Sequence, residues 1–135
     1  MKPIVGSIVA LVLEVMLDKA GQPRVTRAVA AVDCGVVVNP RIAAQQIESA
    51  VIFGLSAALH GRIDIENGAV KQANFDDYRV LRLAETPAIE THFVASDREP
   101  GGLGEPGTPP VAPALANALF ALTGQRLREL PLQLR

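Results

Sequence analysis

The sequence predicts an α+β domain in which antiparallel hairpins pack against two core helices. Two long runs rich in β-branched residues are separated by a short turn, and an Asn-Gly dipeptide lies between alternating residues. Two further apolar segments carry helix start and stop signals. No change of composition divides the 135 residues into two cores, so we expect a single domain over residues 1–135.

The first run spans residues 4–17 and the second spans residues 23–33, and the turn at 18–22 joins them into a long antiparallel hairpin. The first strand is almost wholly apolar, which predicts a strand covered on both faces. Its length also suits a signal peptide, but Glu14 lies inside the run. A membrane span is also disfavoured, because the run is shorter than the roughly 20 residues that a span needs. A buried strand is therefore the better interpretation.

A core helix is predicted to follow. Asn39 can cap it, Pro40 suits the first helical position, and Gly61 can end it. Apolar or small residues recur at the i, i+3, i+4 spacing of one packed helix face. This predicted packed face consists of Ala43, Ile47, Ala50, Val51, Gly54, Leu55 and Ala58.

The rest of the chain contributes a hairpin, a strand and a second helix. Asn67-Gly68 within residues 63–70 is a strong hairpin signal, and residues 88–95 alternate as a half-buried strand. An apolar helix is predicted from Val111 to about Thr123. Pro113 falls in its first turn, where backbone N–H groups have no partner within the helix.

Composition excludes several classes of partner. Thirteen basic and fourteen acidic residues are scattered along the chain, so we expect neither a nucleic acid nor an anionic membrane as a partner. Cys34 is the single cysteine, which rules out an internal disulfide framework and agrees with a reducing compartment. We interpret Cys34 as a small buried side chain.

The stretch GGLGEPGTPP at residues 101–110 holds one carboxylate, Glu105, among glycines and prolines. Glycines allow a backbone to approach a ligand closely, and prolines reduce the entropy lost when a loop becomes ordered. A positioned general base could be built in this way. On residue chemistry alone, a turn with a solvated Glu105 is slightly favoured.

Other candidate residues give weaker signals. Gln46 and Glu48 are two residues apart on the first helix, roughly 200° around its axis, so they cannot both address one ligand. His60 and His92 lack ligand-like spacing, and we interpret both as structural or exposed. We therefore expect no protein-ligated metal.

Several motifs occur in an order that resembles a known family: Val32-Asp33-Cys34-Gly35 with Asn39-Pro40, Gln46-Ile47-Glu48, Gly102-Leu103-Gly104-Glu105-Pro106 and Ala112-Pro113-Ala114-Leu115-Ala116-Asn117-Ala118. Together they resemble the C-terminal part of the molybdopterin-binding large subunit of the xanthine dehydrogenase and aldehyde oxidase family. The isoquinoline 1-oxidoreductase type is the branch that they resemble most.

This resemblance implies a molybdenum hydroxylase that oxidises an aldehyde or an N-heterocycle with oxygen derived from water. It implies that Glu105 is the general base and that Gln46 and Gly104 contact the cofactor. Glu48 then has a structural role, and Ser49 replaces the family's usual glycine. The implied cofactor is molybdenum-molybdopterin, in its cytosine dinucleotide form. The implied partners are the remainder of the molybdenum subunit, a 2Fe-2S subunit and a small-molecule substrate.

Large subunits of this family are several times longer than this chain. We therefore expect activity only after assembly with the missing part, and the chain alone can lack the cofactor. The alternative is a noncatalytic module that binds another protein or self-associates into a homo-oligomer, as the 49% apolar content suggests. A cytoplasmic location is expected, or a periplasmic one if the parent subunit is exported.

Overall fold

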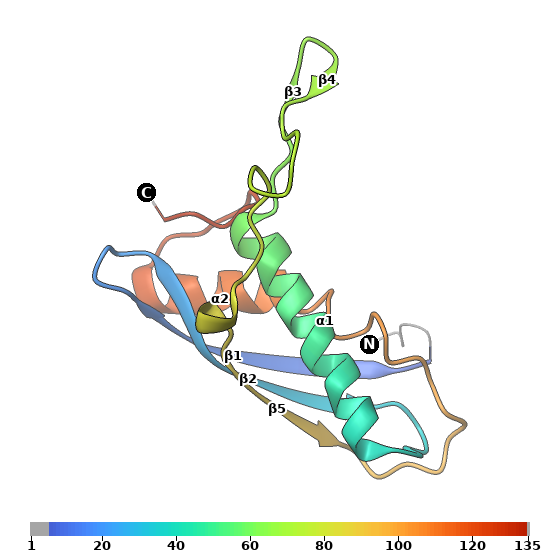
Figure 1. Ribbon diagram of the computed structural model, residues 1–135. Coiled ribbons are helices and arrows are strands. Elements are labelled where there is room, and N and C mark those ends of the chain that lie inside the picture. Colours follow the sequence, from blue (N-terminus) through green and yellow to red (C-terminus); the bar gives the residue numbers. More distant parts are fainter. Residues whose placement is uncertain (1–5, 135) are drawn as a thin grey trace.

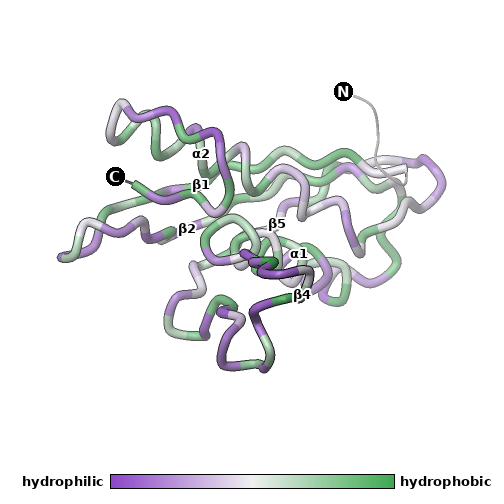
Figure 2. Tube along the Cα trace, turned by 90° about the horizontal axis from the view of Figure 1, so that it is seen from above, coloured by the Kyte–Doolittle hydropathy of each residue, from purple (hydrophilic) through white to green (hydrophobic). Residues whose placement is uncertain are grey.

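The computed structural model describes residues 6–134 and consists of two layers. A three-stranded sheet forms one layer, with the order β1 (Ile8–Leu17), β2 (Pro23–Asp33) and β5 (Ala88–Phe93). Helices α1 (Pro40–His60) and α2 (Val111–Thr123) form the other layer, on one face of the sheet (Figure 1). Seen from above, α2 lies along the β1 side and α1 along the β5 side (Figure 2). The predicted α+β class is confirmed; positions 4 and 5 of the first predicted strand lie outside the described residues.

Strands β1 and β2 form the predicted antiparallel hairpin, with Ile8 opposite Asp33 and Leu17 opposite Pro23. The Asp18 carboxylate closes the turn, since its Oδ1 accepts bonds from the backbone N–H groups of Ala20 and Gln22, each at 2.8 Å. The aspartate side chain thus replaces a backbone acceptor, as it does in many turns.

Strand β5 pairs in parallel with β2, with residues 27–32 in register with residues 88–93. The chain between these strands passes through α1, which is the crossover that a parallel pair requires. The sheet is therefore mixed, a pairing that the alternation of residues 88–95 did not reveal. Beyond β5, the Val94 N–H donates to the Val32 carbonyl at 2.8 Å.

Helix α1 has the predicted caps. The Asn39 side chain accepts from the Ile42 N–H at 3.1 Å, and the Gly61 N–H donates to the last turn. All seven residues of the predicted packed face are buried. By length and composition alone α1 could cross a membrane, a test that core helices also pass, and here its apolar face packs on the sheet.

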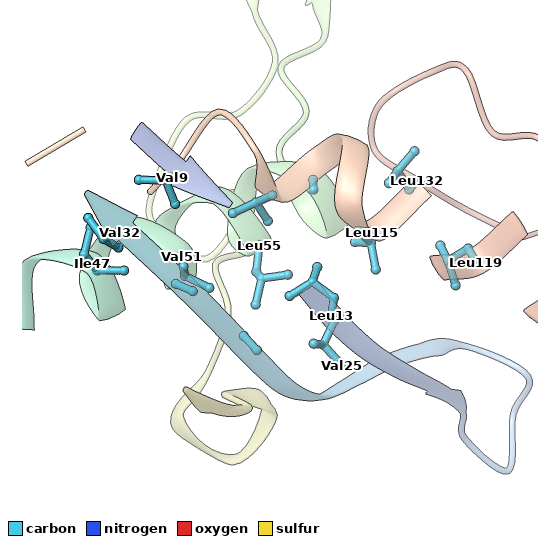
Figure 3. Close-up of a cluster of buried hydrophobic side chains, with 14 of the residues drawn as sticks. Val9, Leu13, Val25, Val32, Ile47, Val51, Leu55, Leu115, Leu119 and Leu132 are labelled. Atoms are coloured by element: carbon cyan, nitrogen blue, oxygen red, sulfur yellow. The ribbon is translucent and has the colours of Figure 1, made fainter. Parts of the chain in front are cut away.

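The core lies between the sheet and the two helices (Figure 3). The C-terminal segment closes it at one end, where the Leu132 N–H donates to the Ala58 carbonyl at 2.7 Å. Cys34 is buried, as predicted. Its buried aliphatic side chains (Figure 3) include Val9, Leu13, Val25, Val32, Ile47, Val51, Leu55, Leu115, Leu119 and Leu132.

The prediction that the first strand is covered on both faces is wrong. Val9 and Leu13 of β1 are buried, but Val12 and Met16 are 64% and 48% exposed. Successive side chains of a strand point to opposite faces, and among residues 6–134 both helices pack on the same face of the sheet. The apolar run therefore leaves a second face uncovered. We call it the bare face, defined by Ala10, Val12, Met16 and Ala31.

Asn67-Gly68 forms the predicted hairpin between β3 (Ile65–Glu66) and β4 (Ala69–Val70). Both turn residues have positive φ, 53° for Asn67 and 81° for Gly68, as such turns require. This hairpin projects away from the two layers (Figure 1), and a short 3-10 helix, η1 (Leu83–Glu85), follows it.

Candidate functional site

Glu105 lies in the loop that joins β5 to α2, residues 94–110. It is exposed, whereas Pro106 and Gly107 directly after it are buried. Its carbonyl oxygen accepts from the Thr108 N–H at 2.9 Å, which closes a turn just before α2. The carboxylate therefore stands on the surface immediately beside a buried segment.

The first half of this loop is held beside the C-terminal end of β2. The Val36 N–H donates to the Arg98 carbonyl at 3.0 Å. The Gly101 N–H donates to the Cys34 carbonyl at 2.7 Å. Arg98 Nη2 also lies 2.7 Å from Asp33 Oδ1. Because these contacts join residues far apart in the sequence, they fix the loop relative to the sheet.

A buried serine adds a side-chain bond to the same half. Ser7 is only 1% exposed, and its Oγ donates to the Gly102 carbonyl at 2.7 Å. The backbones are very close here: a Cβ on Gly101 would lie 2.5 Å from Ser7 Oγ, and a Cβ on Gly35 would lie 2.2 Å from the Glu99 carbonyl oxygen. We call this set of contacts, which ends at Gly102, the first anchor.

A second anchor ties the end of the loop to α1. Thr108 Oγ1 donates to the Ala50 carbonyl at 3.1 Å. A Cβ on Gly107 would lie 2.9 Å from the Ala50 Cβ and 3.3 Å from the Ile47 carbonyl oxygen, so only glycine permits this close approach without adjustment. Pro106, Gly107 and Thr108 therefore hold the loop against the buried side of the helix.

Between the two anchors only Leu103, Gly104 and Glu105 remain, and we call these three residues the tip. Gly104 and Glu105 are both exposed. A Cβ built on Gly104 meets no atom within 4 Å, and its φ does not lie in the left-handed region. The described fold thus places no demand for glycine at position 104. The open space beside its backbone can admit a ligand.

Gln46 is exposed on α1, one turn before Ala50. Residues four apart share a helix face, so Gln46 lies next to the place where the second anchor docks. Glu48 lines a groove of about 620 Å³ that is formed by α1 together with Tyr78, Val80 and Leu81. The expectation that Gln46 and Glu48 address different surroundings agrees with this arrangement. Their roles remain predictions.

The remaining titratable candidates lie away from the tip or are buried. Burial, together with the nearby Asp33 carboxylate, raises the pKa of the Cys34 thiol. Burial is also the main cause that lowers the pKa of His60, with a contribution from Arg79. His92 is exposed. Within residues 6–134, no three His, Cys, Asp or Glu side chains gather into a group that could hold a metal ion.

The anchoring residues Ser7, Arg98 and Thr108 were not identified from the sequence. Their contacts join positions 58 to 95 residues apart, which no local pattern encodes. The glycine that follows Asp33-Cys34 and the glycine before Thr108 were available signals, because each permits a close backbone approach.

The pKa of Asp33 offers a direct test of the first anchor. The hydrogen bond from Arg98 is the main cause that lowers the pKa of Asp33, and the Gly35 N–H adds to it. This contact therefore stabilises the fold above the ordinary aspartate range and is lost as the pH falls through the lowered pKa. We expect Arg98→Gln to raise the pKa of Asp33, measured by carboxyl-detected NMR titration. An unchanged pKa in Arg98→Gln, with Arg128→Gln as the exposed control, would contradict this anchor.

Comparison with known proteins identifies the family. Residues 5–87 match the family model described as a molybdopterin cofactor-binding domain. The chain belongs to this family. The match covers more than half of the chain and includes Gln46 on α1. The resemblance found in the sequence is thereby confirmed.

Curated relatives extend the match. The chain is 38% identical over 132 residues to the beta subunit of the isoquinoline 1-oxidoreductase of Brevundimonas diminuta, covering 97% of this chain and 17% of that protein. It is 38% identical over 125 residues to a subunit of the nicotinate dehydrogenase of Pseudomonas putida, covering 91% of this chain and 10% of that protein. The chain thus spans less than a fifth of the length of these two relatives.

Solved structures share the fold. The aldehyde oxidoreductase of Desulfovibrio desulfuricans matches with a TM-score of 0.78 and 27% identity, over 93% of this chain and 14% of that chain. A Cu,Mo-CO dehydrogenase matches with a TM-score of 0.77 over 91% of this chain and 17% of that chain. At 24% identity, the second match shows the fold alone. The chain therefore has the fold of a segment of these larger chains.

Proposed function

We propose that this chain supplies the general base of a molybdenum hydroxylase, and that it acts after assembly with the rest of a molybdenum subunit. The proposed substrate is an aldehyde or an N-heterocycle. The observation that carries the proposal is the tip, where an exposed carboxylate is held between two anchors. A general base must first be placed within reach of the proton it accepts, and the anchors supply such placement.

The residues of the tip and of α1 suit a bound cofactor. The backbone at Gly104 is open to close approach, and the exposed Gln46 amide can both donate and accept hydrogen bonds. We propose that these two residues contact molybdenum-molybdopterin, in its cytosine dinucleotide form. When bound, the molybdenum centre would supply the oxidising equivalents and act as a Lewis acid toward oxygen. Glu105 would accept the proton released as water-derived oxygen is transferred to the substrate.

The names of relatives support the substrate class and the partners. Isoquinoline 1-oxidoreductase and nicotinate dehydrogenase act, by name, on N-heterocycles, and the aldehyde oxidoreductase of Escherichia coli that contains PaoC acts on aldehydes. Several of these names specify one subunit among others, so we propose that the chain works with further polypeptides. These are the remainder of the molybdenum subunit and a 2Fe-2S subunit that removes the electrons.

Complementation tests this proposal. The beta subunit of the isoquinoline 1-oxidoreductase of Brevundimonas diminuta would be produced without the segment that matches this chain, together with its partner subunits. Adding this chain should restore isoquinoline oxidation, and adding the Glu105→Gln variant should not. Equal turnover with the two forms would reject the proposed role of Glu105.

A second candidate function is a noncatalytic interaction module, and the bare face favours it. Apolar side chains on this face are exposed, with Val12 at 64%. Beside them, Arg27 is paired with Glu14 at 2.9 Å and with Glu90 at 2.7 Å. Because these charges already have partners, another protein surface could cover them without burying an unpaired charge. Self-association through this face is the form of this function that the chain alone can test.

Val12→Asp should weaken self-association through the bare face. Burying an unpaired carboxylate costs more than about 1.4 kcal/mol, so the dissociation constant should rise at least about tenfold. Sedimentation equilibrium at several concentrations would measure it. Val38→Asp is the control, since Val38 is 87% exposed and lies outside the sheet. A wild-type chain that stays monomeric, or equal effects of the two variants, would reject this function.

A further inference from the structure

We propose that Ser7 and Thr108 are positioning residues that hold the two ends of the tip and so aim the Glu105 carboxylate. This inference rests on the proposed function of Glu105 as the general base. Neither side chain belongs to the tip. Each acts through the backbone of the loop, one on each side of Glu105.

Ser7 couples the start of β1 to the loop. Its hydroxyl is buried, and a buried hydroxyl is costly unless it forms a hydrogen bond. The bond to the Gly102 carbonyl satisfies it and joins residues 95 positions apart. Gly102 directly precedes the tip. Loss of the Ser7 hydroxyl would therefore release the backbone at the point where the tip begins.

Thr108 holds the other end in two ways. Its side chain donates to the Ala50 carbonyl in the middle of α1, at 3.1 Å. Its own N–H donates to the Glu105 carbonyl at 2.9 Å, so the same residue bonds directly to the backbone that bears the carboxylate. Its carbonyl accepts from the Val111 N–H at 3.2 Å, at the first residue of α2. Thr108 thus connects α1, the tip and α2.

The short span between the anchors limits how far Glu105 can move. Three residues separate Gly102 from Pro106, which is buried. Release of either anchor would lengthen the free segment and spread the positions of the carboxylate. A misplacement of about 1 Å can cost a catalytic step roughly 100-fold in rate. A positioning defect of this kind should lower kcat and leave KM nearly unchanged, since neither Ser7 nor Thr108 lies in the exposed tip.

The first measurement is made on the chain itself. Backbone ¹⁵N order parameters of Gly104 and Glu105 should be about 0.85 in the wild type and fall below about 0.6 in Ser7→Ala and in Thr108→Val. Thr108→Ser keeps the hydroxyl and should restore the wild-type values. Thr123→Val is the matched control, because Thr123 Oγ1 forms the same kind of bond to the Leu119 carbonyl, at the far end of α2. Unchanged order parameters in folded Thr108→Val, or a tip that is already mobile in the wild type, would overturn the inference.

The second measurement uses the complemented enzyme. Ser7→Ala and Thr108→Val should each lower kcat by about 10- to 100-fold with KM changed less than about twofold. Thr108→Ser should recover kcat. If Glu105→Gln abolishes turnover while Thr108→Val retains full kcat, this inference fails and the proposed function stands. If Glu105→Gln retains turnover, the proposed function fails, whatever the order parameters show.

Discussion

Glu105→Gln should lower the kcat of the complemented enzyme by about 100- to 10,000-fold, because an amide of nearly the same volume cannot accept the proton that a carboxylate accepts. Glu105 is exposed, so the substitution should leave the packing of Pro106 and Gly107 and the stability of the fold unchanged. Steady-state kinetics would give kcat and KM, and thermal unfolding would confirm that both forms are equally folded.

Glu99→Gln is the matched control for this prediction. Glu99 is an exposed carboxylate of the same loop; its backbone carbonyl belongs to the first anchor, and the residue lies outside the tip. Its replacement removes the same charge from the same segment and should leave kcat within about twofold. If the two variants lose turnover equally, the effect is one of loop charge and Glu105 is not the base.

Gly35→Ala should destabilise the chain by about 3 kcal/mol, the largest effect on folding that we predict for a single methyl group. Gly35 has φ of 73°, a left-handed conformation that costs other residues about 1–2 kcal/mol. The added Cβ would also lie 2.2 Å from the Glu99 carbonyl oxygen and 2.6 Å from the Arg98 carbonyl oxygen. Since both obstacles are backbone atoms, the first anchor itself would have to move.

Gly21→Ala separates the two causes. Gly21 has the same φ of 73°, but a Cβ there meets no atom within 4 Å. It should therefore show only the conformational cost, about 1–2 kcal/mol in the free energy of unfolding. Urea unfolding of the two variants would measure both costs. Equal losses would show that the loop does not approach Gly35 as closely as the structure has it.

The sequence predicted helix α1 nearly completely, because its information is local. Asn39, Pro40 and Gly61 mark the ends of the helix through side-chain and backbone chemistry of the helix itself. Its packed face follows from the helical period alone. The extent of α2, Val111–Thr123, was predicted for the same reason.

For the strands, local sequence patterns were not sufficient. The parallel pairing of β5 with β2 depends on the path of the chain through α1, and no pattern within residues 88–95 encodes it. The two-sided burial predicted for β1 failed for a related reason. An apolar run shows that a strand tolerates a cover on each face, whereas among residues 6–134 the helices cover only one.

The residues of the candidate site also fall into two groups, those that local sequence could identify and those that it could not. Glu105 could be singled out because its glycine and proline neighbours are local, and the family resemblance then gave it a role. Its anchors could not be found, because the Ser7 hydroxyl and the Gly102 carbonyl meet only after folding. The relation of Gln46 to the second anchor likewise required the position of Ala50 against Gly107.

The wide sequence separation of the anchors also bears on how the chain folds. The contacts of Ser7, Arg98 and Thr108 close loops of 95, 65 and 58 residues. Contacts between residues so far apart in the sequence have a high entropic cost early in folding. These contacts involve the start of β1, the end of β2 and the middle of α1. A partly folded intermediate that lacks one of these elements therefore cannot hold the tip in place. The orientation of Glu105 would then be among the last features acquired during folding and among the first lost in partial unfolding. A half-folded chain would present no ordered base to the surrounding solvent.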